Sequence, residues 1–315
     1  MLSRRHLRIK VMQALYAYNQ ADADNIPLYE KELLKSIYKT EELFIYFISA
    51  LLEIRQFAEK TLNEAKAKRL PTKEDLDPNL KFANNRFLLH IESNEGMKKA
   101  LNTFKINWVE YEELIKKLYL KILASDGFKE YMSAGEGSFE EDREYIIKVY
   151  KAYIADEDLI LHRFEEINIH WSDDWYFING YVLNYLKEIK ESDSPEKSLP
   201  ALFKDEDDDL DFVKGLFRKT IINNDEYQNT IIKQAKNWEE DRIAMMDFLL
   251  MKMAICELEE FPTVPIKVTL NEYIELSKNY STPKSKLFIN GILDKLIPQL
   301  KAEGKINKSG RGLKE

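Results

Sequence analysis

The sequence contains few of the residues that build turns and cross-links. Its 315 residues include 10 glycines and 9 prolines, a share well below that of typical globular proteins. So few turn residues argue against a sandwich or barrel made of many short strands. A single cysteine, Cys256, excludes an internal disulfide framework and any zinc site built from several thiolates.

Long apolar runs are also missing. The longest extends from Leu43 to Leu52, well short of the roughly 18 residues that a membrane-spanning helix needs. The N-terminus begins with charged residues and continues amphipathically, without the apolar core of a signal peptide. We therefore expect no membrane association and a cytoplasmic location.

Motifs of catalysis and cofactor binding are absent as well. The sequence has no glycine-rich phosphate loop, no GxSxG or HExxH motif and no paired Cys–His motif. Its four histidines lack the spacing typical of metal ligands, and Cys256 lies in an apolar stretch where a thiol acts as a small hydrophobe. We expect no metal, no cofactor and no enzymatic activity.

Helical periodicity dominates what is present. Apolar residues recur with helical spacing at Leu7, Val11, Ala14, Leu15 and Tyr18, which predicts a helix over residues 3–19 with Ser3 as its N-cap. The same patterns predict helices near 28–66, 109–123, 139–155, 173–190, 210–222, 225–237, 240–260, 269–279 and 283–301. No strands separated by hairpin turns are recognisable, so the fold class is all-α.

Three stretches are typical of connections: residues 70–78 with two prolines, 133–138 with two glycines, and 191–209. The last contains the acidic run 205–209 (DEDDD). Such a run is usually solvated, although it can also imitate phosphates beside a basic surface. Both interpretations remain open from the sequence.

Charge is unevenly distributed along the chain. The net charge is −8, yet residues 1–20 and 295–315 each carry +4, so the body between them is strongly acidic. This asymmetry suggests a local anion-binding surface. For residues 301–315 we expect a flexible, solvated basic tail.

The first basic segment is the start of the N-terminal helix. Arg4, Arg5 and Arg8 are spaced i, i+3 and i, i+4, on adjoining parts of one face without neighbouring acids. Cations at a helix N-terminus oppose the helix dipole, whereas guanidinium groups suit phosphate oxygens. Tyr16 follows on the same helix and can stack on a base.

A second basic segment lies near the C-terminus. Thr282 followed by Pro283 predicts a helix start, where backbone N–H groups favour an anion. Lys284 and Lys286 flank this start, and Phe288 follows within two turns. These residues complete a candidate site for a polyanion.

Four blocks together carry a resemblance to a known family. Residues 3–16 (SRRHLRIKVMQALY) resemble the opening helix of the NusB transcription antitermination family. Residues 237–258 resemble its central helices, and 262–280 and 286–295 (KLFINGILDK) its C-terminal signature. The resemblance covers 1–20 and 207–300, and implies a NusB-like helical bundle core interrupted by a large helical insert, 21–206.

The resemblance also implies a function and a set of contacts. Family members bind the boxA element of ribosomal RNA leaders together with the ribosomal protein NusE, and support the RNA polymerase elongation complex. Arg4, Arg5 and Arg8 match the family's arginine motif, Tyr16 its following aromatic residue, and Phe288 its RNA-facing phenylalanine. His6 stands where a further arginine is common, Ile9 replaces a usual acid, and Lys284 replaces a residue that is often acidic.

We therefore interpret the chain as a NusB-like factor that captures single-stranded, boxA-like RNA at Arg4, Arg5, Arg8, Lys284 and Lys286, with Tyr16 and Phe288 stacking on bases. The alternative is a helical protein–protein scaffold that has lost RNA binding. A fragment of an RNA-modifying enzyme is disfavoured because no cofactor motif is present. The insert is acidic and rich in aromatic residues, so we expect it to fold and to add a protein-docking face.

Overall fold

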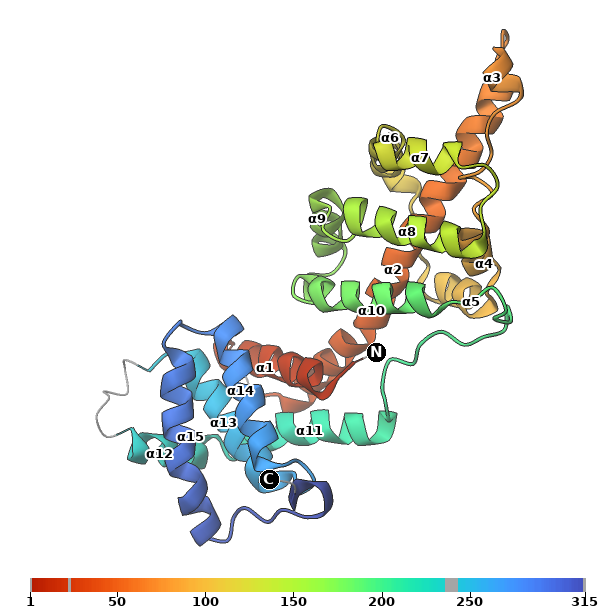
Figure 1. The fold of residues 1–315 in the computed structure, drawn as a ribbon. Coiled ribbons are helices and arrows are strands. Elements are labelled where there is room, and N and C mark those ends of the chain that lie inside the picture. The colour runs from red at the N-terminus through yellow and green to blue at the C-terminus, as the bar shows by residue number, and fades with distance from the viewer. Residues whose placement is uncertain (1, 22–23, 236–242, 314–315) are drawn as a thin grey trace. The chain divides into compact units, whose positions relative to one another are not determined.

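The described part of the chain consists of helices and the loops that connect them. The computed structural model describes residues 2–21, 24–235 and 243–313, and no strand occurs among them (Figure 1). The all-α prediction is confirmed. The chain divides into two compact units: Met1–Ile37 with Leu202–Glu315, called here the split unit, and Tyr38–Ala201, called the central unit.

The helices of the split unit are the start of α2 (Ile26–Lys66), together with α1 (Arg4–Gln20), α11 (Glu206–Ile222), α12 (Asn224–Gln234), α13 (Met245–Glu260), α14 (Ile266–Tyr280) and α15 (Ser285–Ala302). Helix α13 contacts α1, α11, α12, α14 and α15. Its segment from Leu249 to Leu258 is buried throughout, as expected for a mostly apolar helix with neighbours on several sides. This helix is the centre of the split unit. The sequence predicts it over 240–260, and residues 240–242 of that range lie outside the described residues.

Helix α1, from the N-terminal part of the chain, packs against helices of the C-terminal part within the split unit. Ser3 is its N-cap, as predicted. Leu7, Val11 and Leu15 are buried, and the helix packs against α11 and α13. The apolar stripe near the N-terminus is therefore buried against helices that lie about 200 residues later in the chain.

The boundaries of the units differ from those expected at residues 20 and 206. Residues 26–37 belong to the split unit because their side chains pair within it. Both guanidinium nitrogens Nε and Nη2 of Arg218 bond to the carboxylate of Glu30, and Tyr18 contacts the ring of Tyr29 edge to face. Helix α2 continues without interruption into the central unit.

The C-terminal segment, expected to be a flexible tail, packs on the split unit as far as it is described. Lys308 Nζ donates to the main-chain oxygen of Phe261 at 3.0 Å. The amide of Ser309 donates to the main-chain oxygen of Pro262, also at 3.0 Å. A Cβ atom at Gly312 would lie 1.9 Å from the Pro262 oxygen, so only glycine permits this approach. Residues 314–315 lie outside the described part.

The central unit contains the rest of α2 and eight further α-helices among its described residues. They are α3 (Lys73–Leu76), α4 (Arg86–Ser93), α5 (Glu95–Phe104), α6 (Glu112–Leu123), α7 (Asp126–Ser133), α8 (Phe139–Tyr153), α9 (Asp158–Ile167) and α10 (Trp175–Glu188), with short 3₁₀ turns at Val109–Tyr111 and Ile169–Trp171. Helix α8 contacts α4, α6 and α10. The expectation that the insert folds is confirmed.

Aromatic residues form much of the central core. Trp171 is 1% exposed and contacts the rings of Tyr46 and Phe164, while its indole Nε1 donates to the main-chain oxygen of Lys39 at 2.8 Å. Trp108 is buried as well, and donates to Ser49 Oγ at 2.9 Å. Each buried indole N–H thus has an acceptor, as burial of a polar group requires.

No helix among the described residues has both the length and the apolar composition needed to cross a membrane.

Replacement of Trp171 by alanine is expected to destabilise the protein by roughly 3–5 kcal/mol, because it leaves a large cavity and an unpaired carbonyl. Urea unfolding followed by circular dichroism measures this loss. The matched control is Tyr176→Ala, since that side chain is 79% exposed and its removal should change stability by less than about 0.5 kcal/mol. Equal losses in the two variants would contradict the assignment of Trp171 to the core.

Candidate functional site

The basic end of α1 begins with a capping box that involves His6. The amide and the Oγ of Ser3 lie 3.2 Å and 3.0 Å from His6 Nδ1, and the His6 amide donates to Ser3 Oγ. Burial lowers the pKa of His6 to about 4, and the neighbouring Arg5 contributes. The ring is therefore neutral at physiological pH, so that Nδ1 can accept the Ser3 amide hydrogen.

Arg8 lies in the core, not on the surface that the sequence predicted. Its Nε and Nη2 donate to the two carboxylate oxygens of Glu257, both at 2.7 Å, and the residue is 2% exposed. Glu257 also accepts from Thr269 Oγ1 at 2.8 Å and from the Tyr273 hydroxyl at 3.2 Å. Burial acts to lower the pKa of Arg8, but the charge and hydrogen bonds of Glu257 outweigh it and raise the pKa.

This burial corrects the expected role of Arg8. A charge removed from water needs a compensating partner, and Glu257 supplies it with two parallel N–H···O bonds. A phosphate would have to displace a carboxylate that is itself 0% exposed. The guanidinium of Arg8 is therefore closed to direct contact with an RNA backbone in this arrangement.

Arg4 lies at the edge of the unit beside the first turn of α11. Its Nη2 is 2.6 Å from Asp208 Oδ2 and its Nε is 2.8 Å from Asp209 Oδ1. The guanidinium carbon lies 4.3 Å above the ring of Phe212, within the range of a cation–π interaction. Within the acidic run 205–209, Asp208 and Asp209 therefore lie beside a basic side chain, as the second interpretation of this run allowed.

Arg5 is the most exposed of the three arginines, with 48% of its side chain accessible. It donates from Nε and Nη2 to the carboxylate of Glu272 on α14, at 2.7 Å and 2.9 Å. The hydrogen bond to Glu272 raises the pKa of Arg5. All three arginines thus hold carboxylates from distant parts of the sequence.

The second basic segment begins two residues later than predicted. Helix α15 starts at Ser285, so Pro283 precedes the helix. Lys284 and Lys286 are exposed, and Phe288 is partly buried. The carboxylate of Asp247 accepts hydrogen bonds from Ser281 Oγ and Ser285 Oγ at 2.6 Å and 2.8 Å, so an internal anion already lies at this helix start.

The two basic segments approach each other at α14. Its exposed Glu275 is bonded to Lys278, which lowers the pKa of the carboxyl, and Arg5 and Lys286 lower it further. Arg5 also bonds to Glu272 on the same helix, and α14 packs against α15. The two basic segments therefore meet on α14, although Arg5 and Lys286 lie about 280 positions apart in the sequence. Acids accompany the cations on α14: Glu272 pairs with Arg5, and Glu275 pairs with Lys278.

Tyr16 lies farther along α1. It is 40% exposed and lies eleven positions after Arg5, which corresponds to roughly 16 Å along the helix axis. Tyr16 thus stands apart from Arg5, which lies beside Glu272 of α14.

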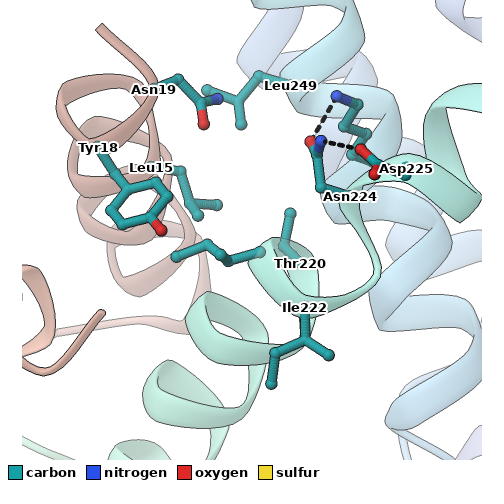
Figure 2. Close-up of a pocket in the computed structure, with 10 residues that line it drawn as sticks. Leu15, Tyr18, Asn19, Thr220, Ile222, Asn224, Asp225 and Leu249 are labelled. Carbon is teal, nitrogen blue, oxygen red and sulfur yellow. Dashed lines mark hydrogen bonds between the residues drawn. The ribbon is translucent and has the colours of Figure 1, made fainter. Parts of the chain in front are cut away.

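A concave feature that the sequence did not indicate lies near the end of α1 (Figure 2). This pocket has a volume of about 320 Å³ and is lined by Leu15, Tyr18, Asn19, Thr220, Ile221, Ile222, Asn224, Asp225, Leu249 and Lys252. Lys252 Nζ donates to Asn224 Oδ1 at 2.7 Å. Its walls come from four helices, so no single stretch of sequence carried a signal for it.

The described residues contain no group of three or more His, Cys, Asp or Glu that could hold a metal ion. Cys256 is buried, and burial raises its pKa to about 12. The thiol is therefore protonated at neutral pH, in agreement with its interpretation as a small core residue.

Comparison of the sequence with known proteins identifies one family. Residues 178–298 match the model of the NusB family. The transcription antitermination protein NusB of Salinibacter ruber is 44% identical over 133 residues, which are 41% of this chain and 82% of that protein. The proteins of the same name from Chloroherpeton thalassium and Clostridium botulinum are 45% and 36% identical, over 33% and 37% of this chain and 49% and 82% of theirs. No solved structure gives a significant match.

Replacement of Glu257 by glutamine should destabilise the protein by roughly 3–5 kcal/mol, because the buried Arg8 then keeps only the more distant carboxylate of Glu272, 3.9 Å from its Nη1. Chemical denaturation measures the loss. Glu260→Gln is the matched control: it lies on the same helix and pairs with Lys219 at the partly exposed surface, where an ion pair contributes about 0–1 kcal/mol. A Glu257 variant as stable as the control would contradict the account.

The His6 ring predicts a pH dependence. Because its pKa in the folded state, about 4, lies below the ordinary value of 6.5, the unfolded chain binds more protons between these values. Stability should therefore fall as the pH decreases from about 6.5 to about 4. Thermal melting across this range should show that the difference in melting temperature between the wild type and His6→Gln changes with pH. A difference that is constant with pH would be the contrary result.

Proposed function

The chain belongs to the NusB family, and from this premise we propose that it is a transcription antitermination factor that binds boxA-like single-stranded RNA through its split unit. The matched relatives are transcription antitermination proteins. The proposed activity is binding, without a catalytic step. Its proposed partners are the ribosomal protein NusE and the RNA polymerase elongation complex.

The observation that carries the proposal is the convergence of cations from both ends of the chain on α14. Arg5 bonds to Glu272 on α14, and α14 packs against α15, whose start has Lys284 and Lys286 exposed. Cations spread over such a surface can follow the backbone of a single strand. We propose that Arg4, Arg5, Lys284 and Lys286 contact phosphates.

The remaining residues predicted from the sequence take different roles in this proposal. Tyr16 and Phe288 would stack on bases, because Tyr16 is exposed and Phe288 is only partly buried, and stacking tolerates any base. Arg8 is a positioning residue: its bond to Glu257 anchors α1, which holds Arg4 and Arg5 at the outer edge.

For the central unit we propose a separate role. Its acids outnumber its bases, so it would repel RNA over about one Debye length, roughly 8–10 Å. Ile169 and Tyr176 remain largely exposed near the start of α10. We propose that this unit docks a protein and leaves RNA recognition to the split unit.

One observation favours the alternative of a scaffold without RNA binding. Each of the three arginines already holds a carboxylate, so the free protein has no unneutralised guanidinium in this motif. If these pairs are permanent, the basic helix start is a structural element. Measurement of RNA affinity separates the two functions.

The double variant Arg4→Ala/Arg5→Ala should weaken binding of a boxA-containing RNA by roughly 1–3 kcal/mol and flatten the dependence of log K on log salt by ~1–2. Fluorescence anisotropy over a series of salt concentrations measures both quantities. Arg69→Ala/Lys99→Ala is the charge-matched control, since both side chains are exposed in the central unit. Unchanged affinity and slope in the first variant would favour the scaffold.

A further inference from the structure

The first turn of α11 supplies an anion to the basic end of α1. Asp208 Oδ2 lies 2.6 Å from Arg4 Nη2, the distance of a charge-assisted hydrogen bond. We propose that Asp208 is an intramolecular competitor of RNA, which occupies the outer edge of the Arg4 guanidinium until a phosphate replaces it. This autoinhibitory contact rests on the proposed RNA-binding function.

The two carboxylates on Arg4 differ in a way that suits this exchange. Asp209 has a side chain that is 7% exposed, and its Oδ2 accepts from the amide of Lys204 at 3.2 Å. The side chain of Asp208 is 76% exposed, and Arg4 is its one ion-pair partner among the described residues. Asp209 is thus held in place, whereas Asp208 can rotate into solvent.

Arg4 would keep its position when Asp208 leaves. Its Nε remains bonded to Asp209, and its guanidinium rests on the buried ring of Phe212. Nη2 also donates to the main-chain oxygen of Asp208 at 3.0 Å, a contact that does not depend on the side chain. A phosphate therefore meets a guanidinium that is already oriented, and it takes the place on Nη2 that the Asp208 carboxylate has left.

The energetic balance favours a polyanion over a single anion. An exposed ion pair contributes little to stability, so the Asp208 contact is weak enough to be displaced. A single-stranded RNA engages several cations at once, and each further phosphate adds to the competition. The contact should therefore reduce affinity for RNA moderately without abolishing it.

Asp208→Asn tests this proposal in the full-length chain. The variant should bind a short single-stranded boxA RNA about two- to fivefold more tightly than the wild type, the fold-change that corresponds to one exposed ion pair. Asp207→Asn is the matched control. It removes the same charge from the same exposed turn, while the structure gives Asp207 no ion pair, so its effect should remain below about twofold.

A double-mutant cycle with Arg4→Ala makes the test specific. If Asp208 acts through Arg4, Asp208→Asn should tighten binding no more than Asp207→Asn does in the Arg4→Ala background. Equal effects of the two aspartate variants in the wild-type background, or weaker binding by Asp208→Asn, would overturn the proposal. Thermal melting of each variant, together with Asp208→Ala, excludes a folding defect as the cause.

The failure of the proposed function would give a different pattern. In that case the wild type would not bind RNA, or Arg4→Ala/Arg5→Ala would bind as the wild type does. Arginine-dependent binding with no difference between Asp208→Asn and Asp207→Asn would overturn the competition alone.

Discussion

The buried ion pair between Arg8 and Glu257 is the interaction on which the rest of the split unit depends. It joins α1 to α13 with two hydrogen bonds of 2.7 Å, and Thr269 and Tyr273 extend it to α14. Such a pair gives little net stability but is costly to break from one side. Its consequence is orientation: with Arg8 turned inward, Arg4 and Arg5 lie at the edge of the unit.

This pair also explains which part of the site was predictable from the sequence. The spacing of Leu7, Val11 and Leu15 predicted the buried face of α1 correctly, since helical periodicity is a local property. The exposure of Arg8 is not local, because it depends on a carboxylate 249 positions later. Likewise, the charge of residues 1–20 did not predict the charge of the surface, because Asp208 and Glu272 fold against it.

The central unit shows a different limit of prediction. Its long helix was predicted, whereas several short helices, among them α4 and α5, were not. Signals for both were present: Asn85 and Asn94 are their N-caps, and each side chain accepts a main-chain hydrogen bond. Helices of 8 and 10 residues present too few apolar positions for periodicity to be distinctive. Caps are the more informative signal for elements of this length.

The central claim is that RNA contacts a face built from the starts of α1 and α15, segments that the fold brings together around α14. Ultraviolet cross-linking of the full-length protein to a boxA RNA, followed by mass spectrometry of the cross-linked peptides, tests it most directly. The account predicts cross-links in peptides that contain residues 3–16 and 281–290, and none in 38–201. Cross-links concentrated in the central unit would contradict it.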